Sequence, residues 1–233
     1  MNGLSRKLPT LAILLLLFSS SNATSITGND RIDIYNSEAS LFGYDTSTIN
    51  VFNGANVSWI DAYDSTTVNI FGGDVSWLQL YDQSTANLSG EFDIIWILIN
   101  DNAESTVSNG NISWLKAYDQ GIANIANLSS LSWLLVNDDV EVNIFGSDFE
   151  YTRGHLSGYW QNGEQFSFWA LEEADLFSGN ISNLIPDNIR LHTAEVSEPM
   201  TILLFVVGLI GIGWASSNRH TLLTSASYWL ERH

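Results

Sequence analysis

The sequence predicts an all-β protein, a single-stranded β-solenoid (β-helix) of about six coils of 18–19 residues that ends in a β-rich C-terminal cap. Three observations predict this fold. An aspartate recurs at that spacing along residues 24–148, apolar and polar residues alternate between the aspartates, and Asn, Asp, Ser, Thr and Gly outnumber the helix-forming residues there. Strand units of this length can bury their apolar side by stacking coil on coil at about 4.8 Å.

Three residue types recur in register and predict three ladders along the solenoid. The aspartates are Asp45, Asp64, Asp82, Asp101, Asp119 and Asp138. Five residues after them come Asn50, Asn69, Asn87, Asn124 and Asn143, with Thr106 in the fourth unit. The tryptophans are Trp59, Trp77, Trp96, Trp114 and Trp133. Glycines mark a turn in four of the units, at Gly54, Gly73, Gly90 and Gly110.

The tryptophans are expected on the core face. In Val57-Ser58-Trp59 and Val75-Ser76-Trp77 the apolar residues are two apart, so strand alternation places each tryptophan beside a core valine. This pattern favours buried, stacked indoles. The alternative is an exposed platform on which sugar rings lie.

The asparagines and aspartates are expected outside the core. Each asparagine lies between aliphatic residues, as in Val68-Asn69-Ile70, so alternation predicts an exposed amide ladder. The aspartates are expected at turns, where a carboxylate accepts hydrogen bonds from nearby backbone amides. The alternative for six stacked carboxylates is a Ca²⁺ site, although no EF-hand loop or Gly-Gly-x-Gly-x-Asp repeat is present. The sequence therefore predicts no required cofactor or metal, with Ca²⁺ as the alternative.

After Asp148 the repeat is lost, and residues 149–193 are expected to form the cap. The segment from Gly154 to Trp160 predicts a strand, Asn162-Gly163 a tight turn, and the segment from Gln165 to Ala170 the returning strand of a hairpin. The segment from Ile189 to Thr193 predicts a last strand. A cap is expected because an open coil presents a free strand edge.

Composition limits the possible partners. The chain has 26 acidic and 8 basic residues, a net charge of −18, which excludes binding to nucleic-acid backbones. It has no cysteine, so neither disulfides nor thiol chemistry are available.

The N-terminal residues 1–23 predict a secretory signal peptide. Arg6 and Lys7 precede an apolar run, small residues follow it, and cleavage is expected between Ala23 and Thr24. The alternative is an uncleaved N-terminal anchor, for which this run is short.

The C-terminal residues predict a membrane-directed tail. Residues 194–199 are expected to form a linker and a short acidic box, residues 200–217 a transmembrane helix that is short for a membrane span, and residues 218–233 a short tail with a basic residue at its start. This layout resembles the PEP-CTERM sorting signal of Gram-negative bacteria, in which a Pro-Glu-Pro box, a transmembrane helix and an arginine cluster follow one another. The matching residues are Val196, Ser197, Glu198, Pro199 and Arg219. Ser197 replaces the first proline, Arg219 stands nearly alone, and residues 221–233 continue where such chains normally stop.

The resemblance implies processing by an exosortase-type enzyme and export to the membrane, surface or extracellular matrix of a Gram-negative cell. The alternative is a C-terminal membrane anchor that is never cut. The repeats look like those of other exported bacterial proteins with this tail. They imply a structural or adhesive component of the cell envelope, exopolysaccharide or biofilm matrix, with extracellular polysaccharide as a possible partner.

The alternative function is a carbohydrate-processing β-helix enzyme, either a polysaccharide lyase or a hydrolase. Glycoside hydrolysis needs two carboxylates at a set separation. The acids that break the repeat are the only candidates for such a pair, namely Asp138, Asp139, Glu172, Glu173 and Asp175. The other acids recur once per coil, as architecture requires, so the sequence assigns no catalytic residue.

Overall fold

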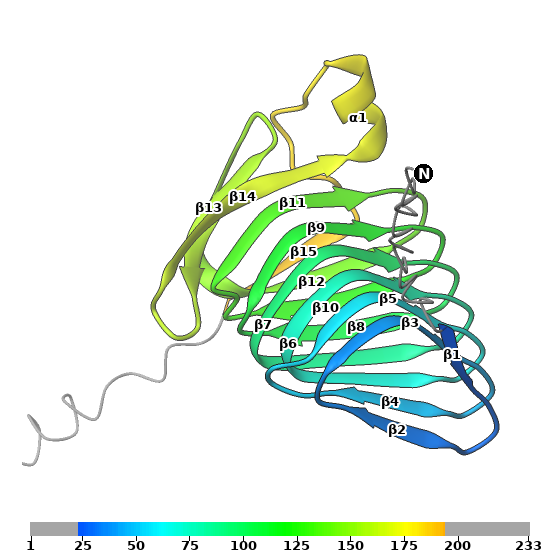
Figure 1. The fold of residues 1–233 in the computed structure, drawn as a ribbon. Helices are drawn as coiled ribbons and strands as arrows, with labels where there is room; N and C mark the ends of the chain where they lie inside the picture. The colour runs from blue at the N-terminus through cyan, green and yellow to red at the C-terminus, as the bar shows by residue number, and fades with distance from the viewer. Residues whose placement is uncertain (1–22, 194–233) are drawn as a thin grey trace, which may run out of the picture. The chain divides into compact units, whose positions relative to one another are not determined.

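The computed structural model describes residues 23–193, which form a stack of coils with two parallel sheets facing each other (Figure 1). The predictions of an all-β fold and of solenoid stacking in about six turns are confirmed. Each coil contributes one strand to each sheet. The first sheet contains β1 (Ala23–Ile26), β3 (Ser37–Gly43), β5 (Asn56–Ala62), the second halves of β6 (Thr67–Leu80) and β7 (Thr85–Ile99), β9 (Asn111–Ala117), β11 (Ser130–Val136) and β14 (Gln165–Glu172).

The second sheet closes the other side of each coil. It contains β2 (Arg31–Ile34), β4 (Thr48–Val51), the first halves of β6 and β7, β8 (Glu104–Ser108), β10 (Ile122–Ala126), β12 (Glu141–Thr152) and β15 (Ile189–Thr193). Because β6 and β7 run through the corner between the two sheets, backbone hydrogen bonding joins all fifteen strands into one network.

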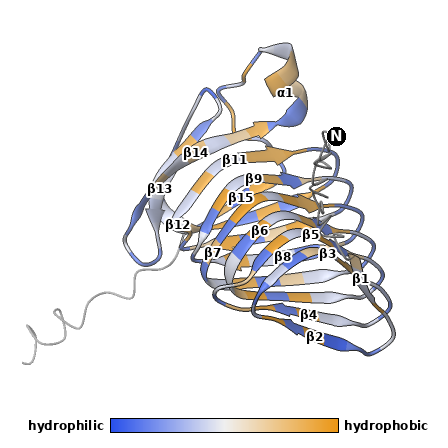
Figure 2. Cartoon of the chain, in the orientation of Figure 1, coloured by the Kyte–Doolittle hydropathy of each residue, from blue (hydrophilic) through white to orange (hydrophobic). Residues whose placement is uncertain are grey.

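The core lies between the sheets and consists of aliphatic columns. Fully buried side chains stack in register from coil to coil, for example Ile60, Leu78, Ile97 and Leu115 in the first sheet. In Figure 2, hydrophobic and hydrophilic positions alternate along the strands. Each inner coil therefore buries its apolar side chains against two neighbours, as expected for a linear repeat protein.

The corner between the sheets requires glycine at several positions. Gly73 has φ +91°, and a Cβ built on it would lie 2.7 Å from the carbonyl oxygen of Ala55 in the preceding coil. A side chain at this position would therefore clash with backbone and occupy an unfavourable conformation. This explains why the glycine column marks a turn.

The solenoid does not end at Asp148, where the sequence repeat is lost. β14 continues the first sheet by pairing Trp169 with Trp133, and β15 continues the second sheet by pairing Ile189 with Val142. Between them, the end of β12, β13 (His155–Trp160) and β14 form an antiparallel meander. A short helix, α1 (Glu173–Ser178), follows β14 within the region expected to form a β-rich cap. Residues 149–193 thus contain both a hairpin and one further coil.

No helix within residues 23–193 has the length and hydrophobicity needed to cross a membrane. The expected helix 200–217 and tail 218–233 lie outside the described residues, as do the linker and box 194–199 and residues 1–22 of the expected signal peptide. The expected cleavage point, between Ala23 and Thr24, falls at the start of β1.

Candidate functional site

The aspartate column forms a hydrogen-bonded ladder between coils. Oδ2 of Asp45 accepts a hydrogen bond from the backbone N–H of Gly28, and Oδ2 of each later aspartate accepts from the backbone N–H of the aspartate one coil earlier, at 3.0 Å from Asp45 to Asp64 and from Asp64 to Asp82. The same contact continues through Asp101, Asp119 and Asp138. The donors belong to the neighbouring coil rather than to the aspartate's own turn, so the expected Asx-turn is replaced by a contact along the solenoid axis.

The turn explains why aspartate occupies this column. All six aspartates have φ between 54° and 59°, in the left-handed region that Asp and Asn tolerate better than most residues. The backbone N–H groups then point along the axis to the next carboxylate. Within residues 23–193, no cluster of three or more His, Asp or Glu side chains could hold a metal ion.

A shallow hollow of about 310 Å³ lies over the later part of this ladder. Its polar lining comes from three consecutive coils and contains Asp101, Asn102, Asp119, Gln120, Asp138 and Asp139. Asn102 Nδ2 donates to Gln120 Oε1 across it at 3.1 Å. The structure thus places Asp138 and Asp139 among the turn residues.

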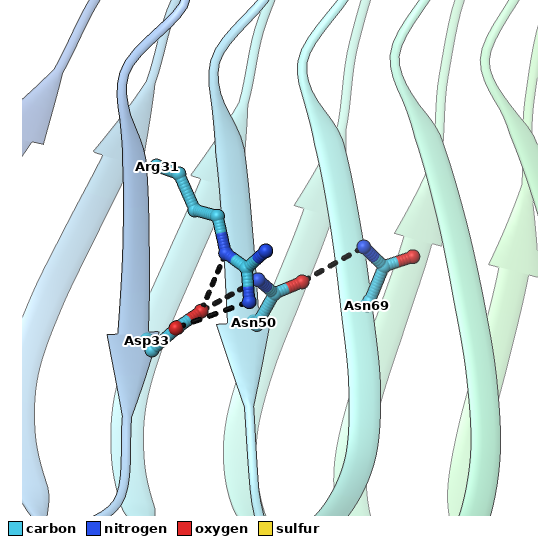
Figure 3. Close-up of polar contacts among 4 residues, drawn as sticks. All are labelled: Arg31, Asp33, Asn50 and Asn69. Atoms are coloured by element: carbon cyan, nitrogen blue, oxygen red, sulfur yellow. Dashed lines mark hydrogen bonds and ion pairs between the residues drawn. The ribbon is translucent and has the colours of Figure 1, made fainter.

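The asparagine column forms the expected amide ladder, in two stretches, but the expectation that the ladder is exposed is wrong for most of it: Asn50 and Asn143 are buried and only Asn87 is exposed. In the first, Asn87 Nδ2 donates to Asn69 Oδ1 at 3.1 Å, and Asn69 Nδ2 donates to Asn50 Oδ1 at 2.8 Å. Asn50 Nδ2 donates in turn to Asp33 Oδ1, which also accepts from Arg31 (Figure 3). The amides all point the same way, and a carboxylate ends the chain of donors.

The second stretch repeats this polarity after Thr106 interrupts the column. Asn143 Nδ2 donates to Asn124 Oδ1 and Asn124 Nδ2 donates to Glu104 Oε1, at 3.1 and 3.0 Å. Nε2 of His192 lies 2.6 Å from Asn143 Oδ1 and can donate at the other end. Both ladders therefore end on a carboxylate toward the N terminus. Sequence reasoning identified the amides but missed these end groups.

The tryptophans stack as expected but are half-buried on the outer side of the first sheet, so the prediction of buried indoles is wrong. Strand pairing matches Val57 with Val75 and Trp59 with Trp77 but skips the serines between them. Strand alternation is broken at this bend, so the fully buried Ile60 follows Trp59 and takes the inward position. The stack runs through Trp59, Trp77, Trp96, Trp114, Trp133 and Trp169, with ring centroids 4.9–5.4 Å apart.

The stacked geometry disfavours the sugar-platform alternative for this column. Adjacent indole planes lie within 18° of parallel, so each inner ring has both of its faces covered by its two neighbours. Only ring edges remain for a ligand, whereas a sugar packs against a ring face. The column is therefore a structural element, worth about 0.5–1.5 kcal/mol per pair beyond area burial.

A groove lies at the glycine corner. It has a volume of about 610 Å³ and runs along the axis across five consecutive coils. At about 4.8 Å per coil it is about 19 Å long. The residues that line it are Asn53, Gly54, Ala55, Asn56, Gly73, Asp74, Glu91, Phe92, Asp93, Gly110, Asn111 and Ser129.

The groove offers hydrogen-bond acceptors beside apolar surface. Asp74 and Asp93 are neighbours in register, and only Asp93 has a side-chain partner within the described chain, Asn111 Nδ2 at 2.7 Å. Glu91 lies beside them, likewise without a side-chain partner there. Phe71, 48% exposed, and Ile95, 50% exposed, belong to the same two coils, and Ile95 lines a second hollow that shares Asp74 and Asp93.

The groove was missed in the sequence because its acids do not recur in every coil. The signal that could have revealed it is the polar residue that comes one to three positions after each corner glycine, namely Asn56, Asp74, Asp93 and Asn111, which share one register column.

A buried carboxylate also lies outside the predicted columns. Asp61 is 8% exposed, and its carboxylate accepts from Trp59 Nε1 at 2.5 Å. Burial raises the pKa of Asp61, and the hydrogen bonds from Trp59 and Tyr63 act in the lowering direction. Its column continues with Gln79 and Leu98, so the register supplies no second acid for a hydrolytic pair.

Of the acids that break the repeat, Glu173 is committed to an ion pair. Its Oε1 lies 2.8 Å from Nζ of Lys116, and the Tyr118 hydroxyl donates to both of its carboxylate oxygens. Burial lowers the pKa of Lys116, but the hydrogen bond and charge of Glu173 outweigh it and the net shift is upward. Glu172 and Asp175 flank Glu173 at the start of α1. This cluster joins the cap to β9.

The residues of the expected sorting signal, Val196 to Pro199 and Arg219, lie outside the described residues. Comparison with known protein families, with characterised proteins and with solved structures finds no match to this chain.

Proposed function

We propose that this chain is an exported, surface-associated β-solenoid that serves as a structural and adhesive component of the cell envelope or extracellular matrix, and that its glycine-corner groove holds a neutral polysaccharide. The observation that carries the proposal is the groove itself. It is long, polar and open along the solenoid axis, as an extended polymer requires.

The chemistry of the groove favours hydroxyl-rich, uncharged ligands. Asp74, Glu91 and Asp93 are acceptors, and no Lys, Arg or His lines the groove within the described residues. Anionic polymers would be repelled by these carboxylates and by the net charge of −18. Sugar hydroxyls can donate to the carboxylates, while the apolar faces of sugar rings can pack on Ile95, which lines the adjoining hollow.

We propose export and surface location because of the predicted N-terminal signal peptide and the C-terminal tail that resembles a PEP-CTERM signal. In this proposal an exosortase-type enzyme processes the chain near Pro199. The apolar segment 200–217 holds it in the membrane before processing. The ladders support a structural role, since hydrogen bonds and stacked rings connect each coil to the next.

The groove is tested by titrating the full-length protein with neutral and with uronic-acid oligosaccharides by calorimetry. Neutral oligomers should bind and acidic ones should not. Asp74→Asn with Asp93→Asn should weaken binding about tenfold, because hydrogen bonds to charged acceptors contribute about 1.5–3 kcal/mol. Asp187→Asn, an exposed acid outside the groove, is the matched control. Equal binding by the groove variant and the control would show that the groove is not the polysaccharide site.

Location is tested by the intact mass of the protein recovered separately from membrane and matrix fractions. A C terminus near Pro199 in the matrix form supports sorting and release. A C terminus at His233 found only in membranes indicates a permanent anchor and contradicts the sorting signal.

A further inference from the structure

The first coil leaves one edge of each sheet unpaired within residues 23–193. β1 pairs only with β3, and β2 pairs only with β4. The core is open at this end, because Ile32 is half-buried whereas Ile49 and Val68, the next residues in its column, are fully buried. An unpaired strand edge beside apolar side chains is a template for another strand.

β2 carries a charge pattern that is complementary to itself. Arg31 and Asp33 are exposed on the outer face, while Ile32 and Ile34 point inward. Nε of Arg31 lies 2.8 Å from Oδ1 of Asp33, with side-chain exposures of 61% and 34% (Figure 3). The strand thus presents a cation and an anion on either side of an isoleucine.

We infer that a second copy of this chain pairs with the outer edge of β2, antiparallel to it, around a two-fold axis at Ile32. Side chains that point inward in one copy must lie opposite inward-pointing side chains of the other copy. The two-fold axis must therefore pass through a residue and not between two residues. With the axis at Ile32, Arg31 lies opposite the partner's Asp33 and Asp33 opposite the partner's Arg31. An axis at Arg31 or Asp33 would instead place like charges opposite each other.

This arrangement uses one surface patch twice, as a two-fold dimer does. It covers Ile32 with the partner's Ile32 and pairs the free backbone groups of β2. The same axis brings the two β1 edges toward each other on the first sheet. The last coils, which carry β14 and β15, then lie at opposite ends of the dimer. Adhesion between two surfaces that each carry an anchored copy follows if the proposed membrane anchoring holds, whereas the pairing itself does not rest on it.

Charge exchange tests the pairing directly. In sedimentation experiments on the full-length protein in detergent, the wild type should form a dimer. Arg31→Asp alone and Asp33→Arg alone should each weaken it at least tenfold. A one-to-one mixture of these two variants should restore dimers, because each introduced charge then faces its opposite in the other chain. A monomeric wild type would overturn the inference, as would variants that dimerise unchanged, or folded variants that fail to recover on mixing.

A cysteine scan tests the register without altering charge. The chain has no cysteine, so a single introduced thiol can form a disulfide only with its counterpart in another copy. In Ile32→Cys the two Cα atoms should lie about 4.5–5.5 Å apart, within disulfide range. In the matched control Ile34→Cys, the two cysteines lie on opposite sides of the axis and four residues apart along the strands. Their Cα atoms should therefore be about 13 Å apart. Rapid crosslinking of the first variant alone is expected. Equal crosslinking of both variants, or of neither, contradicts the proposed register. These two tests measure self-association only, so their failure would leave the groove and the location of the protein to be judged by their own experiments.

Discussion

The Asp82 carboxylate accepts a hydrogen bond from the backbone N–H of Asp64, with Oδ2 and N 3.0 Å apart although the residues belong to different coils. Asp82 also donates its own N–H to Asp101. One residue therefore both occupies the left-handed turn and joins its coil to the two neighbouring coils. The six carboxylates stay close together because each has a backbone donor.

Replacing Asp82 tests these two roles together. Asp82→Ala should destabilise the protein by about 2 kcal/mol, because it loses the acceptor and places a Cβ residue poorly suited to φ 56°. Asp82→Asn should cost less than half as much, since asparagine tolerates the conformation and keeps an acceptor. Urea denaturation of both variants gives the comparison. Equal losses in the two would show that neither role matters at this turn.

The tryptophan stack should appear as coupling between neighbours. Trp96 and Trp114 have centroids 4.9 Å apart and planes 11° from parallel. A double-mutant cycle with Trp96→Leu and Trp114→Leu should give a coupling of about 1 kcal/mol. Trp59 and Trp133 do not touch and form the matched pair, whose losses should add. Additive losses at both pairs would mean that the indoles contribute only by area burial.

Asp61 should make stability depend on pH in an unusual direction. Because burial raises its pKa above the ordinary 3.8, the folded state takes up a proton at a higher pH than the unfolded state. This group therefore destabilises the fold at neutral pH, and its effect diminishes as the pH falls through the raised pKa. Asp61→Asn should be more stable than the wild type at neutral pH, and the difference should shrink toward 3.8. Denaturation midpoints across this range measure it, with Asp187→Asn as control. A pH-independent difference would contradict the raised pKa.

The ion pair between Lys116 and Glu173 should fasten the cap to the solenoid. Their side chains are 17% and 16% exposed, so Lys116→Met leaves a poorly solvated carboxylate and should cost about 2 kcal/mol, below the value for a fully buried pair. Adding Glu173→Leu should recover most of this loss. Hydrogen exchange of α1 should quicken in the single variant and slow again in the double one. If α1 exchanges at the same rate in all three proteins, the ion pair does not stabilise α1.

The coil repeat could be predicted because the residues that define it recur for physical reasons. A left-handed turn favours Asp, and an amide ladder favours Asn, so both leave a regular spacing in the sequence. The tryptophan face could not be predicted by alternation, because the residue before each tryptophan, a serine in every unit except at Ile95, is skipped in the pairing. A bend of this kind leaves no signature in the pattern of apolar residues.

The end of the solenoid was hidden by an insertion. The meander of β12, β13 and β14 places Trp169 two repeat lengths after Trp133, although these residues pair in adjacent coils, so the unit expected one repeat after Trp133 is missing from the sequence pattern. The groove was hidden for the opposite reason. Its acids, Asp74, Glu91 and Asp93, come from two neighbouring coils and are brought together only by stacking.

The shared direction of the asparagine amides has a consequence for how such a protein can change in evolution. In an inner coil, the asparagine donates a hydrogen bond to the preceding coil and accepts one from the following coil. Duplicating such a unit therefore leaves both contacts intact. The terminal carboxylates, such as Asp33, need to be present only once per stretch. The number of coils, and with it the length of the solenoid, can therefore change by duplication or deletion of units without any change at either end.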